Sequence, residues 1–175
     1  MAQKQIPNYI TSKNITKQIQ KTQKELINID SIFINLVNYI KQREGFKSQP
    51  YICPAGYLTI GYGHRTKNIT DSITEYKATL LLKRDIFKNL SILKHNKVND
   101  TIILSLTSLG LNIGIYKVLE SKLIKYKSIE KVKNKISKYI YYKNKDNVYV
   151  KSNNLIKSRE FENNLIDSMK LIINK

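Results

Sequence analysis

The spacing of apolar residues predicts that most of the chain is helical. After residue 30 they recur at three- and four-residue intervals, at Ile32, Phe33, Leu36, Val37 and Ile40. This is the period of a helix that buries one face. Asp30 is a candidate for the N-cap of this helix, and we expect the helix to end at Glu44, because Gly45 follows it.

A change of period after residue 50 predicts a small β-hairpin. Residues 51–53 and 57–60 are typical of two short strands. Pro54 and Gly56 suit the second and fourth positions of a type I turn between them.

The helical period returns beyond the hairpin. Ser72 and Glu75 have the spacing of a capping box, and a helix with one apolar face follows them. A second helix, from about Asp100 to Leu111 and ending near Gly114, is apolar all round, which predicts a central, buried position. Shorter helices are expected near 119–127 and 129–142, and a last helix from about 154 to 172. The pattern predicts an α+β chain, mainly α-helical, with one small sheet in its N-terminal third.

Residues 1–29 have a different character from the rest of the chain. They are polar and rich in lysine and glutamine, with isolated isoleucines at helix-like spacing. We interpret them as an extension that either forms a helix or remains mobile, and residues 30–175 as one folded domain. No segment approaches the roughly 20 apolar residues of a membrane span, and residues 1–20 contain no apolar signal core. We therefore expect neither a signal peptide nor a transmembrane segment.

The chain is strongly basic. Its 31 lysines and arginines and 13 acidic residues give a formal net charge of +18, and the lysines are spread through every segment. A field of this size favours polyanionic partners such as nucleic acid, anionic lipid or an acidic cell-wall polymer. Cys53 is the only cysteine, so the chain can form no internal disulfide and needs no oxidising compartment to fold.

The densest candidate chemistry lies between Glu44 and His64. A carboxyl at a helix end, held against apolar neighbours, can have its pKa raised and act as a general acid, although most glutamates are simply solvated. Cys53 and Thr59 would lie on the two arms of the hairpin, where each is also compatible with ordinary packing. His64 fits a hydrogen-bonded structural histidine better than a catalytic base.

Two glycines would shape the hairpin face beside these residues. Gly61 and Gly63 would share the side of Thr59 in an alternating strand. That side would carry no bulk beyond Thr59, so a flat polymer such as a sugar chain could approach it closely.

The same residues follow a definite spacing. Glu44 is followed after eight residues by Cys53 and after five more by Thr59, which opens the run T-I-G-Y-G-H. This pattern resembles the phage-type lysozymes (endolysins) of glycoside hydrolase family 24, whose motif is Glu, eight residues, Asp or Cys, five residues, Thr. The likeness continues in S-L-T-S-L-G-L-N-I-G at residues 105–114 and in Leu155, Arg159 and Glu162. It covers roughly residues 30–173.

The resemblance implies a lysozyme-like fold, with a small N-terminal β-hairpin lobe and a helical C-terminal lobe. It also implies hydrolysis of the β-1,4 bond between N-acetylmuramic acid and N-acetylglucosamine in peptidoglycan. Glu44 would be the general acid. Cys53 and Thr59 would position water and stabilise charge. The family's cleft implies glycan contacts at Arg65, Leu111 and Asn112.

Further expectations follow from this resemblance and from the charge. We expect no cofactor and no metal ion. The partners would be peptidoglycan glycan strands and, through the net positive charge, an anionic wall or membrane surface, with the protein acting as a monomer. A phage enzyme without a signal would accumulate in the host cytoplasm, act on the cell wall and need a holin for release.

Two other classes of function stay open. A lytic transglycosylase needs one acidic residue and no activated water, and a cysteine at position 53, mostly thiol at neutral pH, keeps this alternative. Its products would carry a 1,6-anhydro sugar in place of a reducing end. A non-catalytic basic protein that binds nucleic acid or wall polymer is supported only by the charge, and its binding would survive Glu44→Gln.

Overall fold

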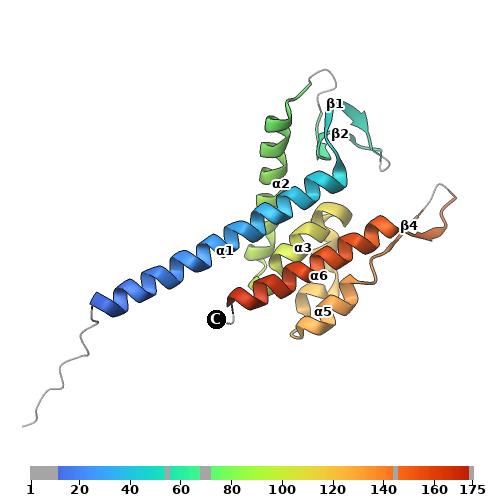
Figure 1. The fold of residues 1–175 in the computed structure, drawn as a ribbon. Helices are drawn as coiled ribbons and strands as arrows, with labels where there is room; N and C mark the ends of the chain where they lie inside the picture. Colours follow the sequence, from blue (N-terminus) through green and yellow to red (C-terminus); the bar gives the residue numbers. More distant parts are fainter. Residues whose placement is uncertain (1–11, 54–55, 68–71, 144–145, 174–175) are drawn as a thin grey trace, which may run out of the picture.

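The first helix is longer than the sequence pattern predicts. The computed structural model describes residues 12–53, 56–67, 72–143 and 146–173. Helix α1 runs without a break from Ser12 to Glu44 (Figure 1). The prediction of an N-cap at Asp30 is therefore wrong, because Asp30 lies inside a segment that has no glycine or proline to end a helix. The boundary at residue 29 between extension and domain stays a prediction.

A small antiparallel sheet follows α1. Its strands are β1 (Lys47–Ile52), β2 (Leu58–Gly61) and β3 (His64–Arg65), in the order β1-β2-β3. The predicted hairpin is thus confirmed, and β3 extends it. Residues 54–55 of the predicted turn lie outside the described residues, although the Gly56 N–H donates to the Cys53 carbonyl over 2.8 Å, as in a β-turn.

The next two helices form the centre of the molecule. Helix α2 (Glu75–His95) begins after Thr74, whose hydroxyl accepts from the Lys77 N–H, so the predicted cap at Ser72 is wrong by two residues. Helix α3 (Asp100–Ile113) ends at Gly114. Ten consecutive residues of α3 are buried, which confirms its predicted central position.

The last third of the chain completes the helical part. It contains α4 (Ile115–Glu120), the 3-10 helix η1 (Lys122–Lys125), α5 (Ile129–Ile136), β4 (Tyr141–Lys143), β5 (Tyr149–Lys151) and α6 (Asn153–Ile173). The helix predicted over 129–142 is too long, because the tyrosine-rich residues after α5 pair with β5 as a two-stranded hairpin. The last predicted helix is confirmed, and so is the mainly helical α+β class.

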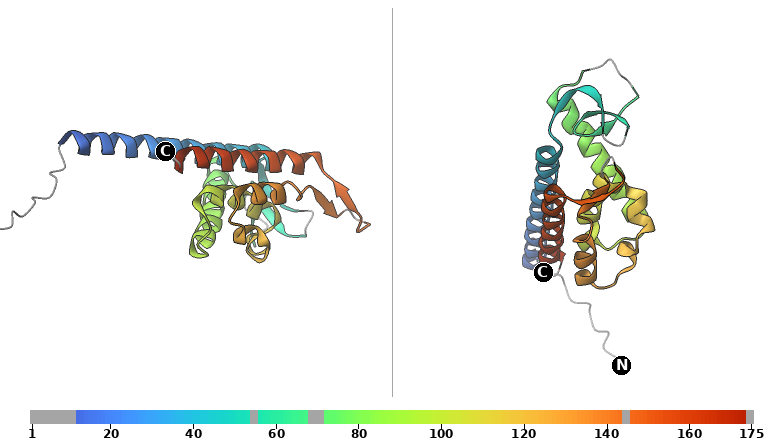
Figure 2. Two further views of the ribbon diagram at one scale, coloured as in Figure 1. Left: turned by 90° about the horizontal axis from the view of Figure 1, so that it is seen from below. Right: turned by 90° about the vertical axis from the view of Figure 1, so that its right-hand side faces the viewer.

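The helices are arranged in two layers with the sheet at one end. Helices α1 and α6 lie side by side, and the other helices cover one side of that pair (Figure 2). Two pairs of stacked aromatic rings contribute to the packing of α1 against its neighbours. Phe33 stacks on Phe87 of α2, and Tyr39 stacks on Phe161 of α6. The N-terminal half of α1 projects beyond the rest of the molecule. Within the described ranges, no helix is both long and apolar enough to span a membrane.

Candidate active site

Glu44 is the last residue of α1, directly before the sheet. Gly45 ends the helix with a φ of +68°, a conformation that glycine adopts without strain. One oxygen of the Glu44 carboxylate, Oε1, lies 2.9 Å from Arg43 Nε and 2.8 Å from Arg43 Nη2. The expected apolar surroundings are therefore wrong, because the last turn of the helix directs this carboxylate to a guanidinium and leaves it one-third exposed, at 33%.

The other carboxylate oxygen of Glu44 faces a glycine. A Cβ atom added at Gly63 would lie 3.7 Å from Glu44 Oε2. Gly63 has a φ of +83°, so a side chain there would be strained as well as close to the carboxylate. The approach to Oε2 is therefore free of a side chain at this position, as predicted for Gly63.

Gly61 differs from the prediction. An added Cβ at Gly61 would meet the Ala78 Cβ at 2.9 Å, so this glycine packs against α2 and does not line an open face. Its φ of +67° ends the alternation of the strand, which is why the two glycines do not share one side.

Cys53 lies one residue beyond the end of β1, and the alternation of that strand places it on the same face as Thr59 of β2. Thr59 is paired with Tyr51, and Cys53 follows two residues after Tyr51 with its N–H bonded to the Tyr57 carbonyl over 2.9 Å. Residues opposite each other in antiparallel strands, and residues two apart along a strand, share a face. The two side chains are therefore diagonal neighbours on the two arms of the hairpin.

The two residues differ in exposure and in partners. Thr59 is buried, and its hydroxyl donates to the Tyr51 carbonyl over 3.1 Å, which leaves its lone pairs free to accept. Cys53 has a free thiol and is half-buried. Cys53 is thus the more accessible polar group on this face.

Arg65 joins the same face from β3. It is paired directly with Thr59, and its guanidinium carbon lies 3.5 Å from the centre of the Tyr57 ring. This cation–π contact fixes a positive charge beside the strand that carries Thr59. The fold therefore brings together Cys53, Thr59 and Arg65.

The other two predicted contact residues lie on α3, in the helical part. Leu111 is half-buried against the core. The Asn112 side-chain carbonyl accepts from Arg159 Nη2 over 3.3 Å. Neither belongs to the sheet face that carries Cys53 and Thr59.

Arg159 belongs to a buried charged cluster that sequence reasoning did not identify as part of the site. Its Nε lies 2.9 Å from Glu162 Oε2, and Ser108 donates to Glu162 Oε1 over 3.1 Å. Burial raises the pKa of Glu162 to about 7, although the charges of Arg159 and Arg43 act in the opposite direction. Burial also lowers the pKa of Arg159.

Arg43 connects this cluster to Glu44. Its side chain is only 12% exposed, and its charge acts on Arg159 and Glu162 as well as on Glu44. The sequence did carry a signal for the burial of Arg43. Arg43 stands seven residues after Leu36, two helical turns on, so it lies on the buried face of α1.

His64 has partners at both ring nitrogens. Its Nδ1 lies 2.6 Å from Asp85 Oδ2, and Arg84 Nη2 lies 3.2 Å from its Nε2. Because arginine can only donate, Nε2 accepts and Nδ1–H donates to Asp85. This arrangement supports the structural interpretation of His64.

Comparisons with known proteins give one consistent family. Residues 41–162 match the family model of phage lysozyme. An endolysin of Acyrthosiphon pisum secondary endosymbiont phage 1 is 37% identical over 95 residues, which are 49% of this chain and 62% of that protein. The matched segment thus spans less than two thirds of that relative.

Solved structures agree in fold. The endolysin from Escherichia coli O157:H7 phage FAHEc1 has a TM-score of 0.61 and 26% identity, over 75% of this chain and 89% of that one. The muramidase domain of SpmX from Asticaccaulis excentricus has a TM-score of 0.66 and 23% identity, over 75% and 94% of the two chains. These matches confirm the lysozyme-like fold. With the family model covering well over half of its length, the chain belongs to the phage lysozyme family, a family of glycoside hydrolases.

Proposed function

We propose that this protein is a peptidoglycan muramidase that hydrolyses the β-1,4 bond between N-acetylmuramic acid and N-acetylglucosamine. The observation that carries the proposal is the position of Glu44. Its Oε2 faces Gly63, which has no side chain. The sheet that begins three residues after Glu44 has Cys53 and Thr59 on one face. A sugar ring could therefore approach the carboxyl closely, with polar groups nearby. Membership in the phage lysozyme family supports the same reaction.

Glu44 would act as the general acid. Its carboxyl would protonate the glycosidic oxygen as the bond opens through an oxocarbenium-like state. Arg43, which holds Oε1, would stabilise the carboxylate that remains after proton transfer.

Cys53 and Thr59 would position the attacking water. The lone pairs of the Thr59 hydroxyl can accept from a water molecule, because its proton is already donated to Tyr51. Cys53, the more accessible of the two, would contact this water directly and help to stabilise charge. The two groups would act jointly.

Contacts with the glycan would come from two parts of the molecule. Arg65 would contact it from the sheet, and Leu111 and Asn112 would contact it from the end of α3. The net charge of +18 would hold the enzyme on anionic wall polymers. If the protein is phage-encoded, it would be made in the host cytoplasm and reach the wall with the help of a holin.

Mass spectrometry of muropeptides released from purified peptidoglycan tests the reaction. A muramidase gives fragments with a reducing N-acetylmuramic acid end. Fragments that all carry 1,6-anhydro ends would instead show a lytic transglycosylase, which needs the acid and no activated water. An absence of released fragments, together with salt-sensitive binding that persists in Glu44→Gln, would show a binding protein.

Glu44→Gln tests the acid. The change keeps the size of the side chain and removes the proton donor, so hydrolysis should fall by about 100-fold or more. The thermal midpoint should change little, since a partly exposed ion pair contributes about 0–1 kcal/mol. Glu160→Gln on the exposed side of α6 is the matched control and should keep the parent rate. If Glu44→Gln keeps more than about a tenth of that rate, Glu44 is not the acid.

A further inference from the structure

The projecting half of α1 carries a stripe of apolar side chains that are exposed. Ile15, Ile19, Leu26 and Ile29 have exposed fractions of 47%, 52%, 56% and 39%. They lie ahead of Leu36, the first residue of α1 that is fully buried in the core. Ile27, outside the stripe, is exposed as well, at 66%. Five exposed large apolar side chains on one protruding helix form the kind of surface that commonly marks an interaction site.

The spacing of the stripe is that of a coiled coil. Intervals of four and three residues alternate without a break along α1, through Ile15, Ile19, Thr22, Leu26, Ile29, Phe33, Leu36 and Ile40. This is the heptad repeat, in which the positions called a and d form the seam between two helices. From Phe33 onward the seam packs against the protein's own domain. Before Phe33 the same seam extends outside the domain.

Within residues 12–29, the charged side chains are kept off this seam. The positions on either side of it, e and g, are mostly neutral: Thr16, Gln18, Gln23 and Glu25. Lys17, Lys21 and Lys24 fall at the outer positions c and f, where they would remain in solvent in a helix pair. In a chain with a net charge of +18, this distribution lets a second basic chain approach the seam.

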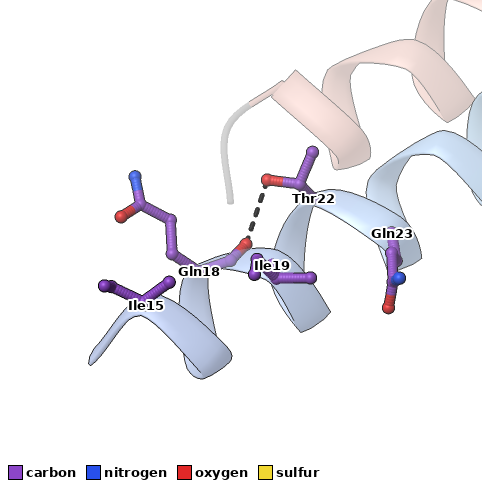
Figure 3. Close-up of a pocket in the computed structure, with 5 residues that line it drawn as sticks. All are labelled: Ile15, Gln18, Ile19, Thr22 and Gln23. Atoms are coloured by element: carbon purple, nitrogen blue, oxygen red, sulfur yellow. Dashed lines mark hydrogen bonds between the residues drawn. The ribbon is translucent and has the colours of Figure 1, made fainter. Parts of the chain in front are cut away.

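A depression on the projecting helix has the composition of a coiled-coil hole. Its volume is about 260 Å³, and its lining residues are Ile15, Gln18, Ile19, Thr22 and Gln23 (Figure 3). The first four of them occupy positions d, g, a and d, which together form the hole that receives a side chain from a facing helix. The Thr22 hydroxyl donates to the Gln18 carbonyl over 3.0 Å, so its polar group is already satisfied within the helix.

We propose that residues 12–29 of α1 pair with the same segment of a second copy of this chain. The two helices run antiparallel. In a parallel pair, the second helix would continue along the face that the domain itself occupies from Phe33 onward, whereas an antiparallel pair places the two domains at opposite ends. A membrane surface suits this stripe less well. Helices that bind at a membrane interface have a broad apolar face, often with aromatic residues, and residues 12–29 contain no aromatic residue.

The proposal replaces the expectation of a monomer and is independent of the proposed reaction. Eighteen residues give a helix pair only about 27 Å long. An interface of this length is small, so we expect a weak dimer whose population depends on concentration.

Sedimentation equilibrium of the full chain, from about 1 µM to about 500 µM, tests the proposal. The weight-average mass should rise from the 20.4 kDa of one chain toward twice that value. Ile19→Lys places a charge in the seam and should weaken association at least tenfold. Ile27→Lys is the matched control, because Ile27 is 66% exposed on α1 but lies at the outer position b, so this variant should associate like the parent. Circular dichroism checks that all three proteins are equally folded.

Several results would overturn the proposal. A parent that stays at the mass of one chain throughout excludes the dimer, and so does an equal loss of association in both lysine variants. Co-sedimentation of a monomeric parent with phosphatidylglycerol vesicles, lost in Ile19→Lys, would assign the stripe to a membrane surface instead. Small-angle X-ray scattering of the dimer should give an elongated particle, whereas a compact particle would overturn the antiparallel arrangement.

Discussion

At the level of single residues, the candidate site depends on how each polar group is held. Glu44 has one carboxylate oxygen fixed by Arg43 and the other facing Gly63. The Thr59 side chain is held by the hydrogen bond that its hydroxyl donates to the Tyr51 carbonyl. Cys53 is the group on this face whose chemistry is least determined by a partner, because its thiol is free and half-buried.

Substitutions of Cys53 therefore test how water is activated. Cys53→Asp should keep substantial activity, because the family motif accepts Asp at this position. Cys53→Ala removes the accessible polar group beside Thr59 and should lose much more. Cys53→Ser separates two roles, since a hydroxyl can orient water but does not ionise near neutral pH. Rates of peptidoglycan hydrolysis by the four proteins, measured across pH, give the answer.

The outcomes of this series are distinct. If Ser works nearly as well as Cys, the group orients water; if Ser fails and Asp succeeds, it acts as an anion. An essential thiolate would also add a rise in activity on the alkaline side that the Asp variant lacks. Full muramidase activity in Cys53→Ala would reduce Cys53 to a packing role.

At the level of elements, the position of the sheet depends on how closely β2 approaches α2. Gly61 and Ala78 are in contact where the two elements meet. Tyr62 strengthens the junction, because its hydroxyl donates to Glu75 over 2.6 Å, and Glu75 also forms an ion pair with Lys41 of α1. The candidate site lies beside this junction.

Gly61→Ala tests the contact. Its Cβ would meet the Ala78 Cβ at 2.9 Å, in a backbone with a φ of +67°. Gly45→Ala is the matched control, because its φ is +68° and no atom lies within 4 Å of the added Cβ. The backbone strain alone should cost about 1–2 kcal/mol in both variants, and the overlap should add about 1–3 kcal/mol in Gly61→Ala. Urea unfolding measures both, and equal losses would show that α2 yields to the added methyl group.

The sequence predicted which helices and strands form better than it predicted the residues at which they begin and end. Periodicity identified α2, α3 and α6, because each has a clear apolar face or is apolar throughout. It placed the start of α1 at Asp30, since a capping residue there preceded the strongest part of the stripe, while the isoleucines before it had no visible packing partner. It extended the helix before them over Tyr141 and Tyr142, because their strand form depends on pairing with β5, which periodicity alone does not show.

The candidate site was predictable to a similar degree. The hairpin pattern placed Cys53 and Thr59 on neighbouring arms. Arg65 was named only through the family resemblance, because the pattern did not predict the third strand that places it beside Thr59. The pattern could not show that Arg43 lies between Glu44 and the Arg159–Glu162 pair. That arrangement joins the end of α1 to α6, more than 100 residues later in the chain, and depends on tertiary packing.

At the level of the whole molecule, the buried Glu162 links stability to pH. Its pKa is raised from an ordinary value of 4.5 to about 7, mainly by burial. Between these two values the folded protein holds a proton that the unfolded chain releases, so this group makes the protein less stable as pH rises. Its contribution is complete below about pH 4.5 and is lost as pH rises through about 7.

Glu162→Gln should remove this dependence, because glutamine resembles the protonated acid at every pH. The variant should be about as stable as the parent near pH 4.5 and more stable by on the order of 2 kcal/mol near pH 7.5. Glu160→Gln on the exposed side of α6 should follow the parent. Urea unfolding across this range measures the difference. A Gln variant that is weaker at every pH would instead show that Glu162 stays ionised in its pair with Arg159.

The net charge also acts at this scale, through the encounter with the substrate. If the lysine-rich surface concentrates the enzyme on anionic walls, hydrolysis of whole sacculi should fall steeply, roughly tenfold, between about 50 and 300 mM salt. Cleavage of a short, uncharged glycan should change less than about twofold, because it depends on the site alone. Equal salt dependence on both substrates would exclude a targeting role for the charge.

A double variant shows whether the surface lysines cause this effect. Lys88→Glu with Lys131→Glu lowers the net charge of +18 by four at two exposed positions outside the candidate site. It should lose activity on sacculi at low salt and keep activity on the short glycan. Lys88→Arg with Lys131→Arg is the matched control, since it keeps the charge and should keep both activities. If both double variants lose activity on sacculi to the same extent, local contacts of these lysines matter more than the field, because the Arg variant keeps the charge and therefore the field.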